Sequence, residues 1–347
     1  MIVYLVVFLI LVLFIVYVFY GSGCPRSLRA NFYGNYFAED AVISEEDKPN
    51  SIESIQKCID SGIGIKTELF ATADRRAVVS AYNDLSKEYG IDKKISECDV
   101  DELEEIGILS LKKFVEIVDG QVPVILELKP GSNNESLCRY TADIIKTSGF
   151  INIGVTSFHS GIMAWFKEKE KKIFRGLTSA PSKDFRSLSK FDRFVTGNLM
   201  SNSVCRPHYI LYRNKPQSIL VKLAFALGMM KGVWTITDKA EGEKMEADKD
   251  IIICRGFIPE KIHFKDLPER VKTQAEINAE KKREEREARR NAREEQKLLQ
   301  QQAKEERKAR KEGTFAEKAE DAMNFAEEVI EEVVETIKET VESFKED

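Results

Sequence analysis

Two pairs of a lysine and a glutamate lie in separate runs that are both typical of buried strands. Lys66 and Glu68 are two residues apart in the run GIKTEL, so in a strand their side chains point to the same face. The apolar neighbours of this pair are typical of a strand that is buried on both sides. Glu127 and Lys129 lie in a second run of this kind, VILELKP. We therefore expect a buried site of acids and lysines where these strands end.

The elements that position these residues occupy about 30–265, where short β-rich runs alternate with amphipathic stretches. This alternation predicts an α/β fold, a (β/α)8 barrel of the TIM type. A doubly wound open sheet is the alternative, but no Gly-rich phosphate loop follows the first strand. One predicted helix begins at a possible cap, Asn50, and ends at Gly62. The eight candidate strands are ANFYG, GIKTELFAT, VPVILELKP, INIGVTSF, KIFRGLTS, PHYILYR, KGVWTIT and DIIICRGF.

An apolar segment precedes the barrel. Residues 2–20 carry no charge and would span about 28 Å as a helix, which predicts a transmembrane anchor over 1–22. A cleaved signal peptide would need a basic start and a shorter apolar run. Arg26 and Arg29 follow the segment, so we expect a single pass with the N-terminus outside and the barrel in the cytoplasm. Six widely spaced cysteines without a CxxC motif fit a reducing compartment.

Two further segments follow the barrel. Residues 271–312 mix both signs of charge at helical spacing, which predicts a charged helical linker. Residues 314–347 carry one apolar stripe on an acidic helix, and such a stripe needs a partner: a second copy, the barrel or another protein. The net charge of -5 and the absence of a basic–aromatic motif argue against a nucleic-acid partner. The stripe is formed by Phe315, Ala319, Ala322, Ala326, Val329, Ile330, Val333, Ile337, Val341 and Phe344.

The run at 48–85, KPNSIESIQKCIDSGIGIKTELFATADRRAVVSAYNDL, resembles the opening of a glycerophosphodiester phosphodiesterase domain. Members of that family read HRG, then PENS or PENT, then GIELDV, then VVxHD. The later candidate strands resemble the family's strands in order, so the resemblance covers about 30–260. It implies a divalent cation, calcium or magnesium, held by carboxylates at the carboxyl face of the barrel, with two histidines as base and acid.

At the positions that carry this chemistry the sequence departs from the family pattern. Phe32 stands at the first histidine and Ala81 at the second. Lys66 replaces the first metal-binding glutamate and Glu68 the aspartate, while Glu127 is kept. Loss of one acid–base group commonly costs about 10²- to 10⁴-fold in rate. An ammonium about 4 Å from a dication is repelled by about 8 kcal/mol at an effective dielectric constant of about 20. No catalytic residue and no cofactor are therefore expected.

The sequence leaves three functions open. We expect Lys66 to pair with Glu68 or Glu127 in place of the cation, and we predict a catalytically inactive, membrane-anchored protein that binds a phosphodiester head group or acts as a scaffold. Lys66, Lys129 and Trp234 are then the substrate-binding residues. The first alternative is an active metal-dependent phosphodiesterase that releases glycerol 3-phosphate and an alcohol, with metal on Glu68 and Glu127. The second is a structural protein with an empty pocket.

Overall fold

The computed structural model describes residues 2–23, 25–268, 317–332 and 334–335. The chain divides into two compact units, Met1–Pro268 and Glu269–Asp347. In the second unit the described residues are helical, within the predicted acidic helix. The predicted charged linker over 271–312 lies outside the described residues.

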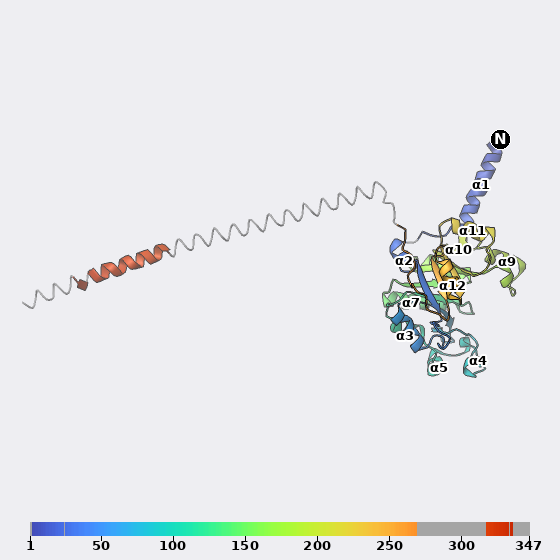
Figure 1. Ribbon diagram of the computed structural model, residues 1–347, viewed down its shortest axis with the longest axis horizontal. Coiled ribbons are helices and arrows are strands. Elements are labelled where there is room, and N and C mark those ends of the chain that lie inside the picture. Colours follow the sequence, from blue (N-terminus) through green and yellow to red (C-terminus); the bar gives the residue numbers. More distant parts are fainter. Residues whose placement is uncertain (1, 24, 269–316, 333, 336–347) are drawn as a thin grey trace, which may run out of the picture. The chain divides into compact units, whose positions relative to one another are not determined.

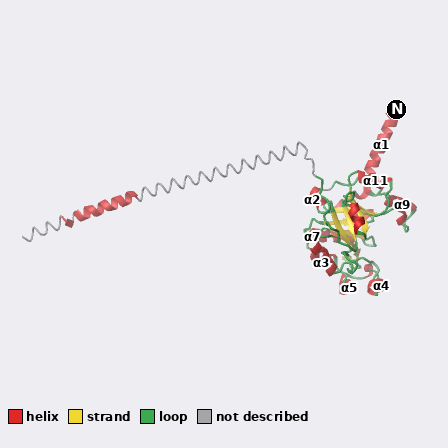
Figure 2. Ribbon diagram, in the orientation of Figure 1, coloured by secondary structure: helices red, strands yellow, loops and turns green. Residues whose placement is uncertain are grey.

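Eight parallel strands close a barrel in the first unit, with helices around them (Figure 1, Figure 2). The strand order is β1-β9-β8-β7-β6-β5-β4-β2, and the pairing of β1 with β2 closes the ring. A short strand, β3, adds to β2 in antiparallel direction. The predicted TIM-type barrel is therefore confirmed. The strands are β1 Asn35–Glu39, β2 Gly64–Ala71, β3 Ala77–Val79, β4 Val124–Leu128, β5 Ile153–Thr156, β6 Phe174–Ser179, β7 Tyr209–Arg213, β8 Met230–Ile236 and β9 Ile251–Cys254.

The helices of the first unit include an N-terminal apolar helix and the crossover helices of the barrel. Most crossover helices bury an apolar face against the sheet, as expected of βαβ units. They are α1 Ile2–Phe19, α2 Arg26–Ala30, α3 Ile52–Ser61, α4 Ser86–Tyr89, η1 Ile95–Glu97, α5 Val100–Glu105, α6 Leu111–Val118, α7 Asn134–Ser148, α8 Ser160–Lys169, η2 Ser182–Asp184, α9 Lys190–Gly197, α10 Asn202–Cys205, α11 Ile219–Ala226 and α12 Lys239–Met245.

The helix α3 shows how local sequence fixes an element that leads into the site. Ser51 is its N-cap, and the Ser51 hydroxyl accepts a hydrogen bond from the Ser54 N–H at 3.2 Å. Gly62 ends the helix in the left-handed conformation with φ 73°. The predicted end at Gly62 is confirmed, whereas the predicted cap at Asn50 is wrong by one residue.

The first barrel strand differs from its predicted position. The sequence ANFYG at 30–34 was expected to form it, but β1 covers Asn35–Glu39. Phe32 precedes the strand and is fully buried at the amino end of the barrel, where its ring stacks on Phe174 at 4.3 Å between centroids. The aromatic run therefore packs the closed end of the barrel interior, and the strand that follows it ends at Glu39.

The segment after β9 returns to the start of the barrel. The Tyr36 N–H donates to the Ile262 carbonyl at 3.0 Å, and the Phe264 N–H donates to the Gly34 carbonyl at 2.7 Å. An antiparallel bridge also links Asn35 to His263. Residues 262–264 thus hold the amino end of β1 in place.

The helix α1 docks by its last turn only. Val18 and Phe19 are buried, and the Arg206 guanidinium donates to the carbonyls of Tyr17 and Tyr20 at 2.6 and 2.8 Å. Most side chains over residues 3–14 are more than half exposed. In the described part of the chain, no helix has both the length and the apolar character that crossing a membrane requires.

Candidate functional site

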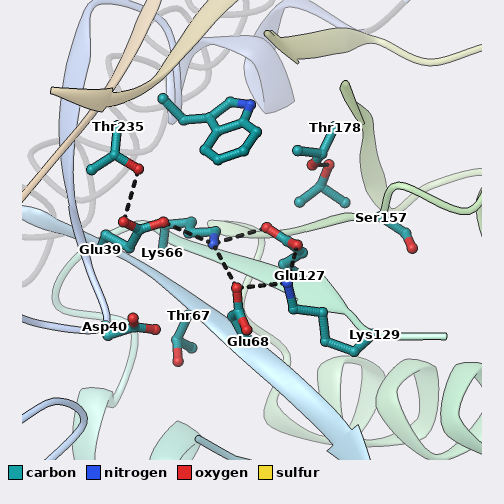
Figure 3. Close-up of polar contacts among 12 residues, drawn as sticks. Glu39, Asp40, Lys66, Thr67, Glu68, Glu127, Lys129, Ser157, Thr178 and Thr235 are labelled. Atoms are coloured by element: carbon teal, nitrogen blue, oxygen red, sulfur yellow. Dashed lines mark hydrogen bonds and ion pairs between the residues drawn. The ribbon is translucent and has the colours of Figure 1, made fainter. Parts of the chain in front are cut away.

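Five charged side chains meet at the carboxyl end of the barrel. We call Glu39, Lys66, Glu68, Glu127 and Lys129 the charge cluster (Figure 3). β1 supplies Glu39, β2 supplies the next two, and the last two come from β4 and the residue just after it. The cluster faces the end of the barrel at which enzymes of this architecture place their active sites.

Strand register brings these side chains to one level. Glu39 pairs with Lys66 between β1 and β2, and Glu68 pairs with Glu127 between β2 and β4. Because alternate residues of a strand share a face, Lys66 and Glu68 both point into the barrel. The predicted acid–lysine site is therefore present, and it includes an acid from β1.

Lys66 lies at the centre of the charge cluster (Figure 3). Its Nζ is 2.8 Å from Glu127 Oε2, 3.2 Å from Glu39 Oε1 and 3.6 Å from Glu68 Oε1. The Lys66 side chain is only 4% exposed. The expected pairing of Lys66 with Glu68 or Glu127 is confirmed, since the ammonium contacts both.

Lys129 closes the outer side of the cluster. Its Nζ is 2.6 Å from Glu68 Oε1 and 2.7 Å from Glu127 Oε1. The Lys129 side chain is 23% exposed, and its ammonium lies 5.7 Å from the centre of the Phe158 ring. Lys129 is thus the cation of the cluster that solvent or a ligand can reach.

The two lysines affect the two neighbouring glutamates differently. Burial disfavours the Lys66 ammonium, but Glu127, Glu39 and Glu68 outweigh it and hold the pKa of Lys66 well above its usual value. Burial also disfavours the Glu127 carboxylate, yet Lys66 and Lys129 lower the pKa of Glu127 to about 2. Burial and the Glu127 charge raise the pKa of Glu68 to about 7, against the opposing effect of the lysines. Glu127 therefore carries the charge, and Glu68 exchanges a proton near neutral pH.

A second layer supports the cluster from β1 and β8. The Thr235 hydroxyl donates to Glu39 Oε2 at 2.8 Å, which fixes the second oxygen of that carboxylate (Figure 3). Asp40 follows Glu39 and is buried, with the Arg255 guanidinium 2.9 Å from its Oδ2. Burial raises the pKa of Asp40, although Lys66 and Arg255 oppose this effect.

An aromatic wall borders the cluster. The indole of Trp234 meets Phe158 edge to face at 5.6 Å between centroids, and its Nε1–H donates to the Ser179 carbonyl at 3.1 Å. The Arg213 guanidinium lies 5.7 Å from the centre of the Trp234 ring. Trp234 thus lies beside the Phe158 ring that Lys129 also contacts.

The positions predicted to replace histidines lie apart from each other. Phe32 is at the amino end, on the opposite side of the barrel from the charge cluster, so it cannot occupy a catalytic position. Ala81 follows β3 and lines a shallow cleft with Asn50 and Tyr82. Of the three histidines, His159 is on the carboxyl side, where its Nδ1 accepts the Ile162 N–H at 3.3 Å and caps α8.

Glu39, Asp40 and Thr235 are the site residues that sequence reasoning missed. Glu39 was overlooked because the first strand was expected five residues earlier, on ANFYG. The signal was available: the run NYFAED ends a short apolar strand with an acid, Glu39, and the recognised strands likewise carry an acid near their carboxyl ends, Glu68 and Glu127.

A divalent cation does not fit this donor set. The three carboxylates that could coordinate one are already turned toward the Lys66 ammonium, and two of them also contact Lys129. Among the residues that the structure describes, no group of three or more His, Cys, Asp and Glu side chains is arranged to hold a metal ion.

Solved structures with this barrel include several phosphodiesterases. An Oleispira antarctica phosphodiesterase, solved in complex with the product sn-glycerol-3-phosphate, is 18% identical, with a TM-score of 0.51 over 64% of this chain and 93% of that chain. A Galdieria sulphuraria protein, provisionally assigned as a glycerophosphodiester phosphodiesterase, is 14% identical, with a TM-score of 0.53 over 65% and 95%. A glycerophosphodiester phosphodiesterase of Thermotoga maritima is 22% identical, with a TM-score of 0.48 over 63% and 93%.

The first two structures show that the chain has the fold of glycerophosphodiester phosphodiesterases, as the sequence resemblance predicted. No protein-family model matches the chain, and a comparison with curated proteins finds no significant match.

Proposed function

We propose that this chain binds a phosphodiester head group at the carboxyl face of its barrel and does not hydrolyse it. The observation that carries the proposal is the position of Lys66, whose ammonium lies between the carboxylates of Glu39, Glu68 and Glu127. A metal-dependent reaction has no free carboxylate set there. Hydrolysis by two histidines is also disfavoured, because β1 ends in Glu39 and the turn after β3 carries Ala81.

The ligand contacts in this proposal come from the outer side of the cluster. Lys129 is partly exposed beside Phe158, and Arg213 stands against Trp234. Lysine and arginine are the usual partners of a phosphate group. Lys66 is too deeply buried to meet a ligand, so its role is to hold the carboxylates in position.

The first test uses the purified full-length chain with glycerophosphocholine, with and without calcium or magnesium. We expect glycerol 3-phosphate release to stay at the background without protein. The diester should nevertheless stabilise the fold, by about 2.7 kcal/mol at a ligand concentration 100-fold above the dissociation constant. Lys129→Met should remove the stabilisation, whereas the exposed Lys112→Met should keep it. Metal-dependent release would overturn the proposal, and a barrel insensitive to the diester would favour the purely structural function.

A second candidate function rests on Glu68. Its carboxyl is partly exposed, with a pKa raised to about 7 by burial and Glu127, which is the range in which a general acid or base works best. This candidate is a metal-independent phosphodiesterase that uses Glu68 for proton transfer. Release that persists in EDTA and is lost in Glu68→Gln would establish it.

We also propose that α1 anchors the protein in a lipid bilayer. The 18-residue helix is about 27 Å long, a little short of a hydrocarbon core of about 30 Å, so the proposal is for a helix that inserts into the bilayer and does not rest on an observed span. Support comes from the apolar side chains exposed around α1 and from Arg26 and Arg29, which follow it. The positive-inside rule assigns these arginines to the inner side, so the proposal includes a cytoplasmic barrel.

Flotation with phosphatidylcholine vesicles tests the anchor. The wild-type chain should float with the vesicles. The double variant Leu9→Arg, Leu13→Arg should not, because each arginine at the centre of a membrane helix costs roughly 3 kcal/mol. Phe191→Arg changes an exposed apolar residue of α9 and should float like the wild type. Equal flotation of the double variant would remove the anchor proposal.

A further inference from the structure

A small cavity lies where α1 meets the amino end of the barrel. It measures about 70 Å³ and is lined by residues 20–23, Arg29, His208 and residues 227–229. We call it the junction pocket. Figure 1 shows α1 leaving the barrel beside α10 and α11, and residues 227–229, which follow α11, form one wall of the pocket. The pocket is on the opposite side of the barrel from the charge cluster, so it does not rest on the proposed function.

The wall of the pocket is fixed by close backbone contacts. The Ser22 N–H donates to the Pro207 carbonyl at 3.0 Å. A Cβ at Gly21 would lie 2.4 Å from Met229 Cγ and 2.7 Å from the Pro207 carbonyl oxygen, so only glycine fits there. Since both sides of the junction are held, the cavity has a defined shape.

His208 is one of the lining residues and carries a ring N–H. It is 95% buried, and its Nδ1 accepts the Arg175 backbone N–H at 3.2 Å. A neutral imidazole that accepts at Nδ1 carries its proton on Nε2. Burial and the Arg175 charge lower the pKa of His208 to about 3, so the ring stays neutral and Nε2–H remains a donor at physiological pH.

Arg29 supplies the charge. Its guanidinium rests on the Tyr33 ring at 5.5 Å, and its Nε is buried without a hydrogen-bond partner among the described residues. A buried donor left unpaired is unfavourable, more so in a charged group, which favours a ligand that accepts from it. The described residues that line the pocket include no acid.

We propose that the junction pocket binds a phosphate-type oxyanion through Arg29 and His208. The volume is about twice the share of one water molecule in the liquid, which admits a compact tetrahedral group and excludes an extended ligand. Arginine is the side chain best suited to phosphate oxygens. The phosphate has two sources with the same chemistry: a free anion, or the head group of a lipid next to α1.

The test measures thermal stability of the full-length chain in uncharged detergent. Inorganic phosphate is titrated against potassium chloride at matched ionic strength, and in a second arm the micelles carry phosphatidic acid or, as its control, diacylglycerol. We expect saturable stabilisation by phosphate, by phosphatidic acid, or by both. Stabilisation by phosphatidic acid alone identifies the lipid head group as the source, and stabilisation by free phosphate shows that the anion suffices.

Variants assign the effect to the pocket. Arg29→Gln should weaken binding roughly ten- to hundredfold, as expected for charged hydrogen bonds, with Arg29→Lys in between. Arg26→Gln, on the same helix and exposed, should bind like the wild type. Arg29→Lys keeps the positive charge, so partial binding by this variant would show that the loss of binding in Arg29→Gln comes from the missing charge and not from misfolding. Equal binding by Arg29→Gln and wild type, binding lost only in Lys129→Met, or no response in either arm would overturn the proposal.

Discussion

At the residue scale, the main feature is one ammonium shared by three carboxylates. Lys66 contacts Glu39, Glu68 and Glu127 within 3.6 Å while almost fully buried. Pairing of this kind seldom adds net stability over an apolar core, but removing one partner is costly. Lys66 therefore acts mainly by holding the three carboxyl groups in place and by keeping Glu127 charged.

Replacing Lys66 should be strongly destabilising. Lys66→Met keeps the volume but leaves buried carboxylates without their cation, so we expect a loss of about 3–5 kcal/mol in the free energy of unfolding, measured with urea at pH 7. Lys112→Met is the matched control, because Lys112 is 67% exposed and lies 3.9 Å from Glu116. The control should change stability by less than about 1 kcal/mol. Equal effects of the two variants would mean that Lys66 is not the cation of the cluster.

Glu68 should give stability a distinctive pH dependence. Its folded pKa is raised to about 7, so its favourable contribution is complete below the unfolded pKa near 4.5 and is lost as pH rises through 7. Glu68→Gln removes this loss. The stability of the wild type relative to Glu68→Gln should fall by roughly 2–3 kcal/mol between pH 5 and pH 8, from 1.36 kcal/mol per pKa unit. Parallel pH profiles of the two proteins would contradict the raised pKa.

The same residues show what the sequence could predict. The pairing of Lys66 was predictable, because two-residue spacing in a buried strand leaves an ammonium little choice of partner. Glu39 was not recognised, because two adjacent aromatic residues at 32–33 favoured a strand that the chain does not form there. Which of the two segments, 30–34 or 35–39, forms the strand depends on how far each lies along the barrel axis. That position follows from the strand register, which a single sequence does not specify.

At the scale of elements, seven of the eight predicted barrel strands are found in place, because runs that are apolar on both faces have few alternatives to a buried parallel strand. Helix ends were predictable to about one residue where a capping group is present. In α3 the cap is Ser51, whose hydroxyl takes the bond that Asn50 was expected to take.

Removing this cap should weaken the element. Ser51→Ala leaves the Ser54 N–H without its acceptor, so we expect a loss of about 1 kcal/mol in the free energy of unfolding. Ser187→Ala, at an exposed position outside the helices, is the control and should be close to neutral. Denaturant titration of both variants measures the difference. A neutral Ser51→Ala would mean that water replaces the cap without cost.

At the scale of the whole molecule, the chain consists of two units that can be tested apart. The described part of the second unit is a helix that exposes Val329, Ile330 and Val334. We propose that the segment 314–347 associates with a helical partner or with a second copy, since an apolar stripe in water gains from being covered.

Truncation after Pro268 tests whether the second unit contributes to the stability of the barrel or to the oligomeric state of the chain. The barrel should keep its unfolding temperature within about 2 °C, which corresponds to less than about 1 kcal/mol for a domain of this size. Light scattering on full-length and truncated chains in the same detergent reports the oligomeric state. A lower oligomeric state after truncation would identify self-association through 269–347, and a chain that ends at residue 313 would then separate 314–347 from the segment before it. A large drop in unfolding temperature would contradict the independence of the units.

The return of residues 262–264 to β1 has a consequence for biosynthesis. Tyr36 and Gly34 complete their hydrogen bonds only with a segment that is synthesised more than 200 residues later. The first strand therefore leaves the ribosome long before its partners at residues 262–264 exist. Domains form as units during translation, and long-range closure is their slow step. Residues 269–347 are still to be made when that segment appears. The ring can therefore close while the nascent chain is still attached.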